Sequence, residues 1–82
     1  MFVVLMKDVD GRRWYRYFRK WENAEAAMMR DIAEVKKLTE IVLESHLDRM
    51  NIEKGFYERE ETLVGSTGMR FHYAVMDEYF ED

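Results

Sequence analysis

The start of the chain contains two short, mainly apolar runs of strand-forming residues. Residues 2–6 read FVVLM, and residues 14–18 read WYRYF. Between the two runs, Asp10-Gly11 is a strong signal for a two-residue turn, because a type I′ turn needs positive φ at both of its central positions. The pattern therefore predicts a β-hairpin over residues 2–21.

A turn at Asp10-Gly11 sets the register of this hairpin and divides its side chains between two faces. One face carries Val3, Leu5, Lys7, Val9, Arg12, Trp14, Arg16 and Phe18. The other face carries Phe2, Val4, Met6, Asp8, Arg13, Tyr15 and Tyr17. On the second face, Asp8 and Arg13 are expected to pair near the turn. Both faces are partly apolar, so the sequence leaves open which one meets the helix, but the second face is the better candidate for the core.

Residues 23–54 carry apolar side chains at the three- and four-residue spacing of an amphipathic helix. The stripe consists of Met28, Ile32, Val35, Val42, His46 and Met50. Asn23 is expected to cap its N-terminus. A helix of this length would span about 45 Å, which is long for a small domain, so we expect a break or bend near Thr39 or after Leu47. Ile41 lies on a flank of the stripe, which is a further sign of a covered surface.

Residues 56–80 are expected to form a second hairpin, whose turn is Gly65-Ser66-Thr67-Gly68. After this turn, apolar residues alternate with other residues in the period of two that is typical of a strand. The preceding strand is poor in apolar residues and rich in glutamate, as an edge strand protected by charge often is. In this arrangement, His72 is expected to face Glu61 across the hairpin.

The predicted order ββαββ indicates a single α+β domain over residues 1–82. The most economical architecture has two layers, with a four-stranded antiparallel sheet and one long helix, straight or bent, on one face. The other face of the sheet would then have no element of the chain over it. Burying a large apolar side chain stabilises a complex by roughly 1.5–3 kcal/mol, so we expect a partner to cover an apolar face of this kind.

Charge is distributed unevenly along the chain, which has a formal net charge of −4. Residues 1–21 hold six bases and two acids, whereas residues 22–82 hold seven bases and fifteen acids. Bases and aromatic residues interleave in residues 12–21, as they do in proteins that bind single-stranded nucleic acid. The overall acidity of the chain argues against non-specific binding of nucleic acid.

The absence of cysteine excludes a disulfide framework, a thiolate zinc site and a cysteine nucleophile. It is also expected of a protein in a reducing compartment, and we expect a cytoplasmic location. The longest apolar run, residues 2–6, is too short to cross a membrane, so no membrane association is expected.

Candidate catalytic chemistry is sparse. His46 and His72 are the only histidines, and neither stands in the HExxH pattern of a zinc protease. The turn that begins at Gly65 contains no Lys or Arg that would bind a phosphate group. Its composition is typical of a tight turn. We therefore expect no enzyme activity, no cofactor and no metal site.

The sequence favours a non-enzymatic protein–protein interaction module that forms a homodimer. The residues expected at the interface are Val3, Leu5, Trp14, Arg16, Phe18 and Ile41. In this hypothesis Trp14 and Phe18 are the central anchors, and Arg16 lies toward the rim. Two alternatives stay open: a foreign protein partner, and a nucleic-acid-binding role for residues 12–21.

Overall fold

A computed structural model describes residues 2–51 and 56–78 of the chain. The described residues form one helix and five strands in the order ββαβββ. Their bounds are β1 Phe2–Val9, β2 Arg12–Phe18, α1 Trp21–Leu38, β3 Ile41–Asn51, β4 Phe56–Gly65 and β5 Arg70–Glu78. Residues 52–54 of the predicted helix, and residues 79 and 80 of the predicted second hairpin, lie outside the described residues.

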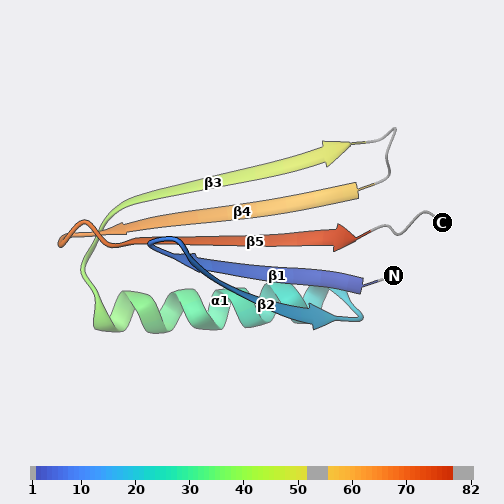
Figure 1. The fold of residues 1–82 in the computed structure, drawn as a ribbon, viewed down its shortest axis with the longest axis horizontal. Coiled ribbons are helices and arrows are strands. Elements are labelled where there is room, and N and C mark those ends of the chain that lie inside the picture. The colour runs from blue at the N-terminus through green and yellow to red at the C-terminus, as the bar shows by residue number, and fades with distance from the viewer. Residues whose placement is uncertain (1, 52–55, 79–82) are drawn as a thin grey trace.

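The strands form one antiparallel sheet in the order β2-β1-β5-β4-β3 (Figure 1). The strands β2 and β3 are therefore its two edges. The helix α1 packs on one face and contacts β1, β5 and β2. The predicted α+β class, with one helix on an antiparallel sheet, is confirmed. The prediction of four strands in the order ββαββ is wrong, because an additional strand, β3, follows the helix.

The first hairpin has the predicted register along its whole length. Its loop is Asp10-Gly11, and the two residues have φ values of 49° and 93°. The Asp8 carboxylate accepts a hydrogen bond from the Gly11 N–H at 2.9 Å and pairs with Arg13 Nε at 2.9 Å. All of these interactions are local in the chain, which is why the sequence predicts this turn correctly.

The helix is shorter than predicted. It ends just before Thr39, whose φ of −138° and ψ of 131° are extended. The break expected near Thr39 is confirmed, but the prediction of a helix beyond it is wrong, because residues 41–51 form β3. Side chains four residues apart share a face in a helix and also in a strand. Val42, His46 and Met50 therefore fit both patterns equally well.

The start of α1 also differs from the prediction. The N-cap position is held by Lys20, which makes no side-chain capping hydrogen bond, so the prediction of Asn23 as the cap is wrong. Trp21, the first helical residue, packs against the core and donates from Nε1 to Glu25 at 3.2 Å. The start of the helix therefore coincides with a tertiary contact rather than with a capping residue.

The helix covers the face of the sheet that carries Val3 and Leu5, so the preference for the face that carries Val4 as the core is wrong. The buried cluster comprises Val3, Leu5, Ala24, Ala27, Met28, Ile32, Val35, Leu63, Phe71, Tyr73 and Val75. Two of its helical members are alanines, whose small side chains allow α1 to lie close to the sheet.

The strand β5 decides which face is buried. Val75 lies directly opposite Leu5, and Tyr73 lies on the same face two residues away. His72 and Ala74 lie on the other face. The larger apolar surface of β5 therefore adds to the Leu5 face, and the helix covers the face on which most apolar surface can be buried.

The second hairpin is formed as predicted, but β4 is an interior strand, so the prediction that it is a charged edge is wrong. Arg59 on β4 binds Glu25 of α1 at 2.8 Å through Nη1 and Glu61 at 3.1 Å through Nη2. His72 lies opposite Thr62 rather than Glu61, and the Nδ1 and Oγ1 atoms are 2.8 Å apart. These charged side chains of β4 therefore bind other residues of the same chain.

Candidate interaction surface

The structure separates the residues that the sequence placed together at one interface. Val3 and Leu5 are 4% and 5% exposed and lie beneath α1, so the prediction that they form an open face is wrong. Phe18 and Ile41 are half-buried and pack against the same core. Most of the surface of these four side chains is therefore buried within the fold.

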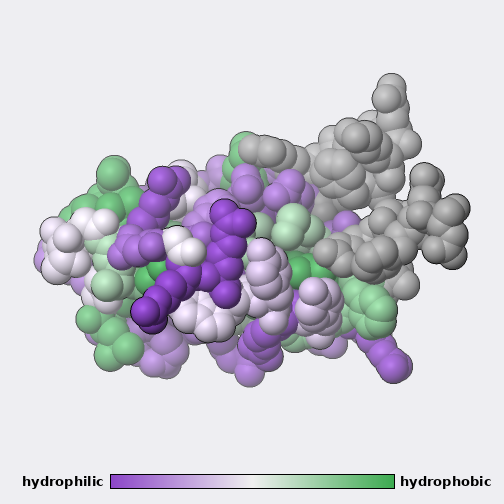
Figure 2. Space-filling model, viewed as in Figure 1, coloured by the Kyte–Doolittle hydropathy of each residue, from purple (hydrophilic) through white to green (hydrophobic). Residues whose placement is uncertain are grey.

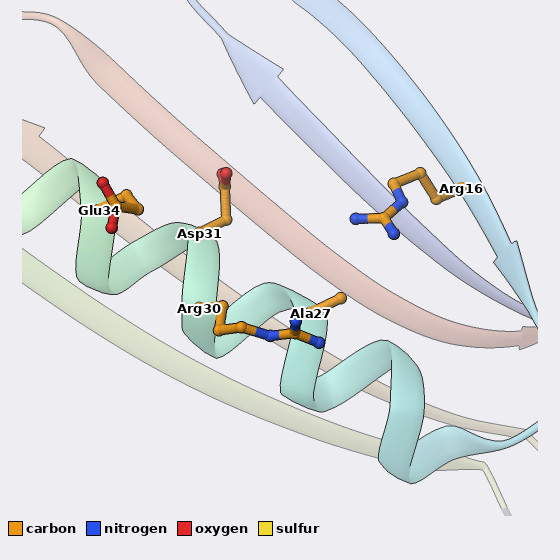
Figure 3. A pocket seen from close by; sticks show the side chains of 5 residues that line it. All are labelled: Arg16, Ala27, Arg30, Asp31 and Glu34. Atoms are coloured by element: carbon orange, nitrogen blue, oxygen red, sulfur yellow. The ribbon is translucent and has the colours of Figure 1, made fainter.

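Trp14 and Arg16 stay exposed at the margin between β2 and α1. The Lys7 ammonium lies 6.0 Å from the centre of the Trp14 indole, and the Arg16 guanidinium lies 5.1 Å from the Phe18 ring. A depression of about 210 Å³ beside them is lined by Arg16, Ala27, Arg30, Asp31 and Glu34 (Figure 3). Two arginines and two carboxylates balance in this depression, so it has no preference for a ligand of either charge.

Asp31 in this depression is bound from two sides. Its Oδ2 atom lies 2.8 Å from Lys7 Nζ and accepts a hydrogen bond from the Tyr73 hydroxyl at 2.5 Å. Partial burial alone would raise the pKa of Asp31, but the hydrogen bonds from Lys7 and Tyr73 hold it below its usual value. Burial and the bond to Asp31 raise the pKa of Tyr73. Asp31 is therefore charged and Tyr73 neutral near pH 7, and the hydrogen bond between them links α1 to β5.

The sheet face away from α1 carries an apolar patch over β2, β1 and β5, which we call the aromatic patch. Its members are Phe2, Val4, Met6, Tyr15, Tyr17, Ala74 and Met76. Val4 is only 1% exposed although the helix lies on the opposite face of the sheet. Phe2, Tyr15 and Tyr17 are 47%, 52% and 62% exposed. A group of exposed aromatic side chains of this kind is typical of an interaction surface.

The strand register orders the aromatic patch into rows. One row consists of Tyr15, Met6 and Ala74, and the next consists of Tyr17, Val4 and Met76. The bulky tyrosines therefore lie along the β2 edge, and the smallest member, Ala74, lies on β5. The side chains of the patch therefore stand higher above the sheet along β2 than at Ala74 on β5.

Charged and polar groups border the aromatic patch. At the turn end, the N–H of Gly11 and the guanidinium of Arg13 lower the pKa of Asp8. On β4, a Glu60 carboxylate oxygen lies 3.5 Å from His72 Nε2. Figure 2 shows apolar and weakly polar residues beside strongly hydrophilic ones across the middle of the molecule. The patch therefore has the polar rim that surrounds many interface cores.

His46 belongs to a polar network in the β3–β4 part of the sheet, and its predicted place on an apolar helix stripe is wrong. Its Nδ1 atom lies 2.5 Å from Glu61 Oε1, and its Nε2 atom lies 2.7 Å from Asp48 Oδ2. The hydrogen bonds with Asp48 and Glu61 raise the pKa of His46. Among the residues that the structure describes, no His, Asp and Glu side chains are grouped so as to hold a metal ion.

Sequence reasoning missed the aromatic patch as a surface, because it assigned the members on β1 and β2 to the core. One signal was present, since residues 71, 73 and 75 place the larger apolar side chains of β5 on one face. Linking that face to the Leu5 face requires the register between β1 and β5, which are more than sixty residues apart in places. Such long-range pairing is not encoded in a local pattern.

Comparisons of the chain with protein-family models, with curated proteins and with solved structures gave no match. Within residues 2–51 and 56–78, no helix is long and apolar enough to cross a membrane. The geometry of the aromatic patch is therefore the main functional observation.

Proposed function

We propose that the protein is a non-enzymatic interaction module that associates with a second copy of itself through the aromatic patch. The observation that carries this proposal is the exposure of three aromatic rings, Phe2, Tyr15 and Tyr17, on the sheet face opposite the helix. Water-exposed aromatic rings that lie together gain free energy when a partner covers them. A second copy of the protein brings the same exposed aromatic rings to the contact.

A second copy fits the patch because the row of Tyr15, Met6 and Ala74 has a large end on β2 and a small end on β5. A half-turn about an axis parallel to the strands, above β1, brings β2 of one copy over β5 of the other. Tyr15 then faces Ala74, and Tyr17 faces Met76. Sheets that pack face to face are about 10 Å apart, and a large side chain over a small one fills that spacing.

The size of the patch indicates a weak complex. Burying the exposed half of an aromatic ring stabilises it by about 1–1.5 kcal/mol. The rings of both copies together contribute roughly 6–9 kcal/mol, against an association cost of about 4–15 kcal/mol. The most favourable balance, about 5 kcal/mol, corresponds to a dissociation constant of about 0.2 mM, so the dimer is expected only at high protein concentration.

Light scattering on the native chain and on Tyr17→Arg tests the proposal. The native mass is expected to rise above the 10.0 kDa of one chain as concentration increases. Tyr17→Arg is expected to lower the mass measured at the highest concentration, because the charge cannot be buried in the contact. Leu38→Arg is the matched control, since Leu38 is 83% exposed but lies at the end of α1. A Tyr17→Arg protein with the native mass would contradict the proposal.

A second candidate function uses the same face. Arg13, Tyr15 and Tyr17 follow one another on the open side of β2, and a base beside two stacking rings is typical of single-strand nucleic-acid binding. However, Arg13 already pairs with Asp8, and Glu60 on β4 lies directly opposite Ala74 of the patch, on the same face. These carboxylates repel a phosphate backbone, so self-association is the stronger proposal.

A labelled short oligothymidine distinguishes the two functions. Binding that weakens as salt is added and is lost in Tyr15→Ala would favour the nucleic-acid function. Absence of binding at low salt, together with a concentration-dependent mass, would favour self-association.

A further inference from the structure

The strand β3 is a sheet edge, and among the residues that the structure describes no strand pairs with its outer side. It is eleven residues long and stands last in the strand order. Residues 42–48 are exposed without interruption. In Figure 1, β3 lies at the opposite side of the sheet from α1, which contacts β1, β2 and β5. An edge of this length presents a row of backbone N–H and C=O groups that can pair with another strand.

Two of the usual protections of an edge strand, proline and a bulge in the middle of the strand, are missing from β3. The chain has no proline, and the one register irregularity of β3 lies at its start, between Ile41 and Leu43. Val42, Leu43 and Leu47 are 56%, 65% and 44% exposed. Figure 2 shows apolar residues gathered at the end of the molecule where α1 leads into β3. The edge is therefore both open and partly apolar, a combination that favours strand pairing.

We propose that β3 pairs antiparallel with β3 of a second copy about a two-fold axis at Ser45, so that the two sheets become one continuous sheet. In this register, Leu43 lies opposite Leu47 of the second copy, and Glu44 lies opposite His46 of the second copy. Each of these pairs occurs twice because of the symmetry. An apolar pair and a pair of opposite charge each stabilise an antiparallel ladder.

Symmetry and the two faces of the sheet restrict the register. In an antiparallel pair, each residue lies opposite a residue whose side chain is on the same face of the sheet. In a symmetric pair of β3 strands, the two-fold axis must therefore pass midway between the two copies of one residue. An axis at Glu44 would bring two glutamates together, and an axis at His46 would place Glu44 opposite Asp48. Like charges directly opposite each other destabilise a sheet, so these two registers are unfavourable.

An axis at Leu47 also avoids like charges, because His46 would then lie opposite Asp48. That register pairs Leu47 with itself but places Leu43 opposite Asn51, which leaves one leucine of each copy without an apolar partner. An axis at Ser45 covers both leucines of both copies. Of the four registers compared, it is the one that gives both leucines an apolar partner and brings no like charges together.

The charges within one copy are compatible with this register. Glu44 already binds Lys36 at 2.5 Å, and His46 is held between Glu61 and Asp48. The pairing adds Glu44 of the second copy to the acidic groups around His46. The contact shares no residue with the aromatic patch, so it goes beyond the proposed function and does not depend on it.

Cysteine cross-linking tests the contact on a clean background, because the native chain has no cysteine. In the proposed register, Ser45 of one copy lies directly opposite Ser45 of the other. Residues in that position have Cα atoms about 4.5–5.5 Å apart, which suits a disulfide. Ser45→Cys is therefore expected to form a disulfide-linked dimer when the full chain is oxidised.

Two variants control for chance collision and for register. Ser66→Cys places an exposed cysteine in the β4–β5 turn, which lies beside the start of β3 but outside the proposed strand pairing. It is expected to cross-link on the order of tenfold more slowly than Ser45→Cys, because no preformed pair holds its thiols within disulfide distance. Leu47→Cys, which reports an axis at Leu47, is also expected to cross-link slowly.

Cross-linking in the Ser45→Cys/Tyr17→Arg chain separates the two proposals. Fast cross-linking in this chain supports the β3 contact whether or not Tyr17→Arg changes the mass of the native chain. A Ser45→Cys rate equal to that of Ser66→Cys would overturn the contact. Faster cross-linking of Leu47→Cys than of Ser45→Cys would overturn the register, and loss of cross-linking with Tyr17→Arg would overturn the independence of the edge.

Discussion

Tyr73 donates its hydroxyl hydrogen to Asp31 over 2.5 Å and thereby joins the centre of the sheet to the middle of α1. The Tyr73 ring is fully buried on β5, and Asp31 also binds Lys7 on β1 at 2.8 Å. A buried tyrosine needs a partner for its hydroxyl group, and this carboxylate supplies one. The pair therefore connects three elements that are distant in the sequence.

Removing the Tyr73 hydroxyl tests how much this link stabilises the fold. Tyr73→Phe is expected to lower the free energy of unfolding by about 1–2 kcal/mol, because a hydrogen bond to a charged group is lost while the ring remains packed. Urea unfolding at neutral pH measures the change. Tyr17→Phe is the control, since the exposed Tyr17 has no buried hydroxyl group. Equal unfolding midpoints for Tyr73→Phe and the native chain would refute the role of the link.

The close approach of α1 to the sheet depends on small residues. Ala24 is fully buried, whereas Ala33 of the same helix is exposed. Ala24→Leu is expected to destabilise the protein by about 1–3 kcal/mol, because the added atoms must push the helix away from the sheet. Ala33→Leu is expected to leave the stability nearly unchanged. Thermal unfolding of both variants checks the difference, and a stable Ala24→Leu protein would show that the helix has room to move.

The turn of the first hairpin depends on a left-handed backbone. Gly11 has a φ of 93°, and a Cβ atom at this position would meet no other atom within 4 Å. Gly11→Ala therefore tests backbone strain without a steric clash, and its expected cost is about 1–2 kcal/mol. Gly11→Asn is expected to cost less, because asparagine tolerates positive φ better. If the two variants unfold at the same denaturant concentration, strain at Gly11 does not limit stability.

The His46 network makes the stability depend on pH. Its two carboxylate partners, Asp48 and Glu61, raise the pKa of His46 above the usual value of 6.5, and Arg59 also binds Glu61. Because the pKa of His46 is higher in the folded protein than in the unfolded chain, the protonated imidazole stabilises the fold. This stabilisation is complete below about pH 6.5 and is lost as the pH rises through the higher pKa of the folded state.

The His46→Gln variant isolates this effect. The melting temperature of the native chain is expected to exceed that of His46→Gln near pH 6, and the difference is expected to shrink as the solution becomes alkaline. Comparing the two chains at each pH removes the contribution of His72, which both contain. A difference that stays constant or grows with increasing pH would contradict the assignment of His46 as a cation between two carboxylates.

Local chemistry explains the parts of the fold that the sequence predicts correctly. The Asp10-Gly11 loop needs only its own positive φ values and the nearby Asp8 carboxylate, so the register of the first hairpin follows from a few consecutive residues. The second hairpin is predicted for the same reason, from the turn that begins at Gly65. A break near Thr39 was expected from the length of the predicted helix, but the end of the helix there was not.

Residues 41–51 show where a local pattern becomes ambiguous. Val42 and His46 are four residues apart, a spacing that places side chains on one face of a helix and also on one face of a strand. The chain becomes a strand here because β4 offers it a partner over nearly its whole length. That partner lies further along the chain, so the choice is made by strand pairing rather than by the local pattern.

The sequence by itself determined the class of the protein, both hairpins and the register of the first one, because those features depend on turns and on alternation over a few residues. Only the tertiary structure decided that Val3 and Leu5 are buried and that Tyr15 and Tyr17 are exposed. The reason is physical: both faces of the first hairpin are apolar enough to be buried. The pairing of β1 with β5 aligns Leu5 with Val75, and the helix covers the face on which that alignment gathers the most apolar surface.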